Sequence, residues 1–163
     1  MNLEIKFVSQ KIEKGEEKMR EILFRSKRLY NREWIIGHLL KYEDGAARIV
    51  PNNTDIFCFE KDESIIQTIA HRVDPKTVGQ YTGFVDKNGK RIFEGDVIKH
   101  DITSDTSHKA IVIYDNGNTR FIGTVIGTEP RIMWVGMINR NNEPVVEIIG
   151  NIYDNSELLN GGE

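Results

Sequence analysis

Residues 80–98 read QYTGFVDKNGKRIFEGDVI, and the fold predicted for the chain starts from this stretch. Two runs rich in aromatic and β-branched residues flank Asn88-Gly89, a pair that favours a type I′ turn because both central residues take positive φ. Gly95 then bends or bulges the chain before a third strand-like run. We expect the Asp96 side chain to accept hydrogen bonds from backbone N–H groups at this bend. The stretch therefore predicts a hairpin followed by another strand.

Similar signals recur along the chain. Asn116-Gly117 lies between two apolar runs and predicts a second type I′ hairpin. Short β-branched and aromatic runs recur at intervals of about ten residues, the pattern of an antiparallel all-β domain. Helix is expected only within residues 9–18 and in the tail 155–159, with Asn155 or Ser156 as its cap. We expect strands near residues 20–27, 33–41, 55–60, 65–73, 78–85, 90–93, 95–101, 109–115, 119–127, 130–137 and 145–153.

These elements predict a mainly β protein with little helix. Residues 73–163 are expected to form a small antiparallel β-barrel, SH3-like or related, because glycine bends soon after the turns curl a small sheet. Residues 19–72 are expected to form an N-terminal β-hairpin region, and residues 1–18 an N-terminal extension. Alternation along the strands assigns the following side chains to the core: Ile92, Val97, Ile111, Ile113, Phe121, Val125, Ile132, Trp134, Val146, Ile148 and Ile152.

The composition is that of a globular protein. The 163 residues are 39% hydrophobic and 29% charged, with a formal net charge of -3. The single cysteine, Cys58, excludes an intramolecular disulfide and a zinc site of several cysteines. No apolar run approaches the roughly 18 residues of a membrane span, and the charged N-terminus has no apolar core of signal length. We therefore expect a cytoplasmic protein with no membrane partner.

Basic and aromatic side chains gather between residues 20 and 34. A basic hairpin with interleaved aromatic rings is able to track phosphates and stack bases. The negative net charge of the whole chain is unlike that of a typical nucleic-acid-binding domain. One alternative for the function is nevertheless a nucleic-acid-binding module that uses Arg20, Arg25, Lys27, Arg28 and Trp34.

A second alternative is a hydrolase or metal-dependent enzyme. Glu94 and Asp96 form a pair of carboxylates around Gly95, and His100 and His108 flank a polar loop that contains further acids. No nucleophile stands near the two carboxylates in sequence, and the histidine loop is polar enough to be simply solvated. We therefore expect no catalytic residue, no metal site and no cofactor.

Three segments carry a resemblance to a known family. They read MREILFRSK at residues 19–27, VDPKTVGQYTGFVDKNGKRIFEGDVIK at residues 73–99 and VVEIIGNIYDNSELL at residues 145–159. In order and spacing they resemble the YopX family of bacteriophage and prophage proteins. The resemblance implies a phage or prophage origin, the cytoplasm of a bacterial host and a mainly β fold. It carries over no activity and no functional residues.

Members of that family typically begin at the Met-Arg-Glu block, whereas eighteen residues precede Met19 here. Two interpretations stay open: the extension is an additional strand that pairs with a neighbouring subunit, or the true start is Met19. Together, the sequence and the resemblance predict a non-enzymatic accessory protein that acts through binding, as a homo-oligomer or with a phage or host protein. A binding surface is expected at Tyr81, Lys87, Arg91 and Glu94.

Overall fold

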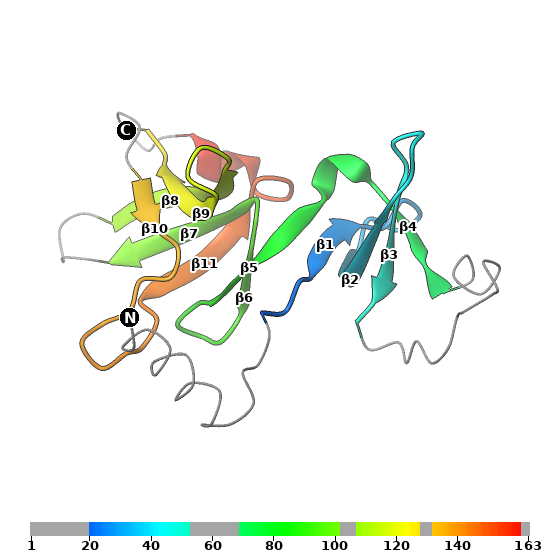
Figure 1. The fold of residues 1–163 in the computed structure, drawn as a ribbon. Helices are drawn as coiled ribbons and strands as arrows, with labels where there is room; N and C mark the ends of the chain where they lie inside the picture. Colours follow the sequence, from blue (N-terminus) through cyan, green and yellow to red (C-terminus); the bar gives the residue numbers. More distant parts are fainter. Residues whose placement is uncertain (1–19, 53–68, 102–106, 128–131, 161–163) are drawn as a thin grey trace, which may run out of the picture.

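The computed structural model describes residues 20–52, 69–101, 107–127 and 132–160, and the regular structure in these residues is mainly β-strand, with almost no helix. The strands form two antiparallel sheets, which Figure 1 shows side by side with β5 and β6 between them. The prediction of a mainly β protein with little helix is confirmed.

The first sheet has the strand order β4-β3-β2-β1-β5-β6. Its strands are β1 (Phe24–Lys27), β2 (Trp34–Lys41), β3 (Ala47–Pro51), β4 (His71–Val73), β5 (Gly79–Val85) and β6 (Arg91–Phe93). Sequence reasoning missed β3, a short run that follows the turn at Gly45 and ends at Pro51, although β3 pairs with both β2 and β4. The strand expected at residues 55–60 lies outside the described residues.

The second sheet has the strand order β10-β9-β8-β7-β11. Its strands are β7 (Asp96–Asp101), β8 (Ser107–Asp115), β9 (Arg120–Val125), β10 (Ile132–Trp134) and β11 (Val146–Asn151). Among the described residues, the edge strands β10 and β11 do not pair with each other, so the sheet is not closed. Closure into an SH3-like barrel therefore stays a prediction.

The chain passes from the first sheet to the second at Gly95, between β6 and β7. Gly95 has a φ of 79°, donates its N–H to the carbonyl of Val112 at 2.9 Å and accepts the N–H of Ile152 at 2.9 Å. Asp96 Oδ2 accepts the N–H of Phe93 at 2.8 Å, which confirms that Asp96 ties this bend. The domain boundary expected at residues 72 and 73 falls within β4, and β5 belongs to the first sheet through its pairing with β1.

Both predicted hairpins form, but neither has a type I′ turn. Positive φ occurs only at Gly89 in the first turn and only at Thr119 in the second, so the Asn-Gly pairs do not supply two residues of positive φ. An aspartate organises each turn instead: Asp86 Oδ1 accepts the N–H groups of Asn88 and Lys90, and Asp115 Oδ1 accepts that of Gly117. The side-chain bonds of such Asx turns outweigh the dipeptide preference.

Two short 3₁₀ helices complete the described chain. Pro75–Thr77 begins after Asp74, whose side chain accepts the N–H of Lys76, and Ser156–Leu159 confirms a helical turn in the tail. Asn155 does not cap that turn with its side chain, because its Oδ1 accepts the N–H of Asn151 at 3.2 Å. The helix expected within residues 9–18 lies outside the described residues.

On β8 and β10 of the second sheet, the buried side chains lie on the face opposite to the predicted one. Ile113, Ile132 and Trp134 are 41%, 54% and 60% exposed, while Val112 and Met133 are buried in their place. A shift of one residue turns every side chain of a strand to the other face, and β8 is apolar at both parities. Of the other predicted core side chains, five are buried and three are half-buried. The buried ones are Ile92, Val97, Phe121, Val125 and Val146, and the half-buried ones are Ile111, Ile148 and Ile152.

Candidate functional site

One face of the first sheet is polar and aromatic where it meets the second sheet. Arg25 and Lys27 alternate along β1 and therefore project to the same side, and their cross-strand partners on β2 are Ile36 and Trp34. The intervening residues of these strands face the opposite side, where Ile35 belongs to a buried apolar cluster. On this face of β1 and β2, the cationic side chains Arg25 and Lys27 therefore lie beside the apolar Ile36 and the aromatic Trp34.

Arg25 is buried between two rings and paired with a buried carboxylate. Its Nη2 lies 2.6 Å from Oδ1 of Asp96 and donates to the Glu94 carbonyl at 3.2 Å. Its guanidinium carbon lies 4.7 Å from the centroid of Trp34 and 5.0 Å from that of Phe93, within cation–π range. Burial raises the pKa of Asp96 above its usual value, and the Arg25 charge offsets part of that shift.

A second polar junction lies beside the first. Asp154 follows β11 and pairs with Lys27, and it also accepts hydrogen bonds from Trp34 Nε1 at 2.8 Å and from Asn151 Nδ2 at 3.0 Å. Burial by itself would raise the pKa of Asp154, but the hydrogen bonds from Lys27, Asn151 and Trp34 outweigh it and lower the value to about 2. Asp154 is therefore ionised at neutral pH.

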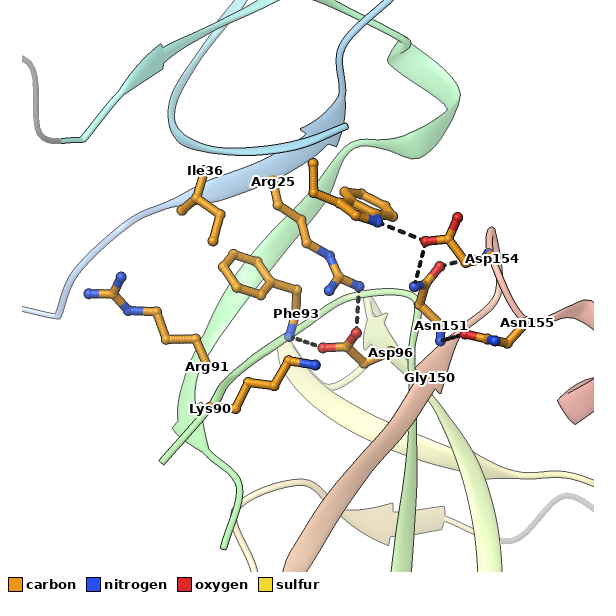
Figure 2. Close-up of a pocket in the computed structure, with 11 residues that line it drawn as sticks. Arg25, Ile36, Lys90, Arg91, Phe93, Asp96, Gly150, Asn151, Asp154 and Asn155 are labelled. Atoms are coloured by element: carbon orange, nitrogen blue, oxygen red, sulfur yellow. Dashed lines mark hydrogen bonds and ion pairs between the residues drawn. The ribbon is translucent and has the colours of Figure 1, made fainter. Parts of the chain in front are cut away.

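A pocket of about 500 Å³ opens between these two junctions (Figure 2). That volume lies in the range of small-molecule sites, which are mostly apolar with a few fixed polar groups. Apolar and aromatic side chains come from β2 and β6, and polar groups come from β1, the β5–β6 turn, the start of β7, the end of β11 and the residues after it. The lining residues are Arg25, Trp34, Ile36, Lys90, Arg91, Phe93, Asp96, Gly150, Asn151, Asp154 and Asn155.

The β5–β6 turn is attached to β11, which holds this wall in place. Asp86, a buried residue of the turn, accepts the N–H of Ile148 at 3.2 Å in addition to those of its own turn, and Lys87 donates its N–H to the carbonyl of Val146 at 2.9 Å. Burial by itself would raise the pKa of Asp86, but backbone hydrogen bonds from Lys90, Ile148 and Asn88 outweigh it and lower the value. Lys90 therefore extends into the pocket from an anchored turn.

The residues of the enzyme hypothesis do not meet in this pocket. Glu94 Oε2 accepts the N–H of Gln80 at 2.9 Å, and Asp96 is engaged by Arg25 and by the N–H of Phe93. His100 and His108 are cross-strand partners on β7 and β8 and do not line the pocket. In the described part of the chain no three His, Cys, Asp or Glu side chains are placed to hold a metal ion.

The four residues of the predicted binding surface are spread over two sites. Tyr81 is buried, packs on Phe93 with ring centroids 5.5 Å apart and lies beneath the Arg91 guanidinium at 5.7 Å. Lys87 pairs with Glu147 at 2.6 Å at the edge of the second sheet. Of the four, only Arg91 lines the pocket, and it is paired with Glu21 at 2.9 Å.

The residues of the nucleic-acid hypothesis differ in their access to solvent. The side chains of Arg25 and Lys27 are each 10% exposed and ion-paired, and Arg28 pairs with Glu33 at 3.2 Å. Arg20 is exposed, with its guanidinium carbon 5.9 Å from the centroid of Phe121. A nucleic-acid surface that used all five predicted residues would require the ion pairs of Arg25 and Lys27 to open.

Sequence reasoning found Arg25, Trp34, Arg91 and Asp96 of the pocket as members of separate hypotheses. It missed a set of residues that come from β2, the β5–β6 hairpin and the end of β11: Ile36, Lys90, Phe93, Gly150, Asn151, Asp154 and Asn155. The run of Asn and Asp side chains directly after β11 is the one local signal for them, because such residues bond neighbouring backbone groups and are otherwise typical of turns.

Comparisons with known proteins place the chain in a family. The family model described as "YopX protein" matches residues 23–160, which covers most of the chain. Among curated proteins none matches. A solved structure, the crystal structure of protein EF1440 from Enterococcus faecalis, is 23% identical and aligns with a TM-score of 0.48 over 85% of this chain and 98% of that chain. No helix among the described residues is long and apolar enough to cross a membrane. The extent of the family match shows that this chain belongs to the YopX family.

Proposed function

We propose that this protein is a non-enzymatic binding protein whose ligand enters the pocket between the two sheets. The observation that carries the proposal is the construction of that pocket from two apolar or aromatic strands on one side and anchored polar groups on the other. Its volume suits a small molecule, and its carboxylates are held by internal donors rather than poised for acid–base chemistry. In a bacterial host carrying a prophage, the protein would act by sequestering or sensing that molecule.

The test compares compounds retained by the wild type and by pocket variants. Full-length protein is dialysed against a small-molecule extract of bacterial cytoplasm, and the retained compounds are identified by mass spectrometry. Ile36→Trp fills the pocket from β2, and Ile36→Ala removes an apolar contact from the same wall. We expect at least one compound to be enriched by the wild type and depleted with either folded variant. If no compound shows this difference, the pocket is not the binding site.

We further propose that the protein works as a homo-oligomer, with a second copy on the outer face of the second sheet. Ile113, Ile132 and Trp134 are exposed on that face, and β10 is the terminal strand of the sheet in the described part of the chain. Packing of this face on the same face of a second copy is compatible with two-fold symmetry and would bring both apolar rows together. The solution mass of the full chain tests this assembly.

A further inference from the structure

The charges around the pocket are balanced except at one residue. Arg25 pairs with Asp96, Lys27 with Asp154, and Arg91 with Glu21. Lys90 lines the pocket, and no ion pair forms for it among the described residues. Figure 2 shows its side chain extending toward Asp96, whose carboxylate is already engaged by Arg25 and the N–H of Phe93. The lining of the pocket therefore carries one surplus positive charge.

The pocket also has more hydrogen-bond donors than its acceptors need. Asp154 accepts from three side chains, and Asp96 accepts from Arg25 and Phe93, so both carboxylates are supplied with donors. The Lys90 ammonium lines the pocket and forms no hydrogen bond among the described residues. The pocket thus lacks acceptors and not donors.

From these two imbalances we infer that the ligand of this pocket is a small oxyanion with an attached apolar group. This inference rests on the proposed function and adds the chemical class of the ligand. The carboxylate or phosphate oxygens contact the Lys90 ammonium and the guanidinium of Arg25, where charge-assisted hydrogen bonds are shorter and stronger than neutral ones. The apolar group packs against Phe93 and Ile36, which line the pocket beside Arg25.

Stacking of a ligand ring on Trp34 is not part of this arrangement. Arg25 and Lys27 both lie over the Trp34 ring, at 4.7 Å and 5.3 Å from its centroid, and its indole N–H is engaged by Asp154. Trp34 instead reports on the site, because a ligand that contacts Arg25 changes the electrostatic environment of the indole. This makes its fluorescence a suitable probe.

The experiment uses full-length protein with Trp134→Phe, which leaves Trp34 as the single tryptophan. The probes are phenyl phosphate, phenylacetate and the neutral phenethyl alcohol, and binding is followed by Trp34 fluorescence. We expect one or both anions to saturate the signal, and whichever binds identifies phosphate or carboxylate as the anionic group. Phenethyl alcohol should bind at least about tenfold more weakly, because it lacks the charge-assisted contacts.

Variants of Lys90 provide the decisive comparison. Lys90→Gln should weaken anion binding at least about tenfold, Lys90→Arg should retain it, and Lys41→Gln, an exposed lysine that does not line the pocket, should leave it unchanged. Equal affinity for the alcohol and the anions, or undiminished anion binding by Lys90→Gln, would overturn the inference. If none of the probes binds while dialysis still recovers a pocket-dependent compound that is not an anion, the anion inference fails and the proposed function stands.

Discussion

Trp34 on β2 donates a hydrogen bond of 2.8 Å from Nε1 to Oδ2 of Asp154, a residue 120 positions further along the chain. This bond, the Lys27–Asp154 pair and the Arg25–Asp96 pair link the face of β1 and β2 to the second sheet and its C-terminal segment. The junction that forms the pocket is therefore held largely by charged and polar groups. Such contacts respond to pH and to removal of a single charge more strongly than apolar packing does.

Removal of Arg25 is expected to destabilise the protein strongly. Arg25→Met leaves the buried Asp96 carboxylate without its counter-ion and should reduce the free energy of unfolding by about 3–5 kcal/mol. In Arg25→Met/Asp96→Asn the unpaired charge is gone and the acceptor for the Phe93 N–H is kept, so part of the loss should be recovered. Urea denaturation measures both variants. Arg28→Met, which breaks a pair with the exposed Glu33, serves as control and should cost less than about 1 kcal/mol. A double variant as unstable as Arg25→Met would contradict this explanation.

The Asp154 junction should weaken in acid. The pKa of Asp154 is about 2 in the folded protein, below the value of about 3.9 for an unfolded aspartate. The folded state therefore binds this proton less readily, so its contribution to stability is present above about pH 4 and is lost as the pH falls toward 2. Denaturation of the Trp134→Phe protein, followed by Trp34 fluorescence at several pH values, measures this loss. With Asp154→Asn added, the pH dependence in this range should be shallower, whereas Asp44→Asn, in an exposed turn, should leave it unchanged.

The two turn aspartates should differ in their contribution to stability. Asp86 is buried and accepts three backbone N–H groups, from Asn88, Lys90 and Ile148, so Asp86→Ala leaves buried donors unsatisfied at a cost of about 1–3 kcal/mol. Asp115→Ala removes the corresponding side chain from an exposed turn and should cost clearly less. Thermal unfolding followed by circular dichroism compares them. Equal losses would mean that the bond to β11 adds nothing to the turn.

Assembly through the outer face of the second sheet should depend on its largest apolar side chain. Trp134→Glu places a charge in the centre of the proposed contact between copies and should reduce the solution mass to that of one chain, as measured by light scattering. Tyr30→Glu changes an exposed aromatic residue elsewhere and should have no effect. A wild-type protein that is already monomeric at high concentration would refute the proposed assembly.

Removal of residues 1–18 tests the predicted role of the N-terminal extension. If the extension pairs with a neighbouring subunit, the truncated protein should have fewer chains per particle in solution than the full chain at the same concentration. An unchanged number of chains per particle after truncation would show that assembly does not use the extension.

The sequence by itself determined the elements that depend on local chemistry. The hairpins around residues 88 and 116, the bend at Gly95 and its tie by Asp96 were all predictable, because turn residues and alternating apolar runs act over a few neighbouring positions. The turn type was not predictable, because the side chains of Asp86 and Asp115 accept backbone N–H groups within the turns.

Tertiary structure alone decided which face of the second sheet is buried and which residues form the pocket. The β8 strand offers apolar side chains on both faces, so only packing against the rest of the sheet selects Val112 over Ile113 for the core. The pocket likewise depends on contacts between distant segments: Arg25 meets Asp96, and Trp34 meets Asp154, because the two sheets come together along β1 and β2. No spacing within the sequence encodes such pairs, since their distance is set by the strand order and not by the number of residues between them.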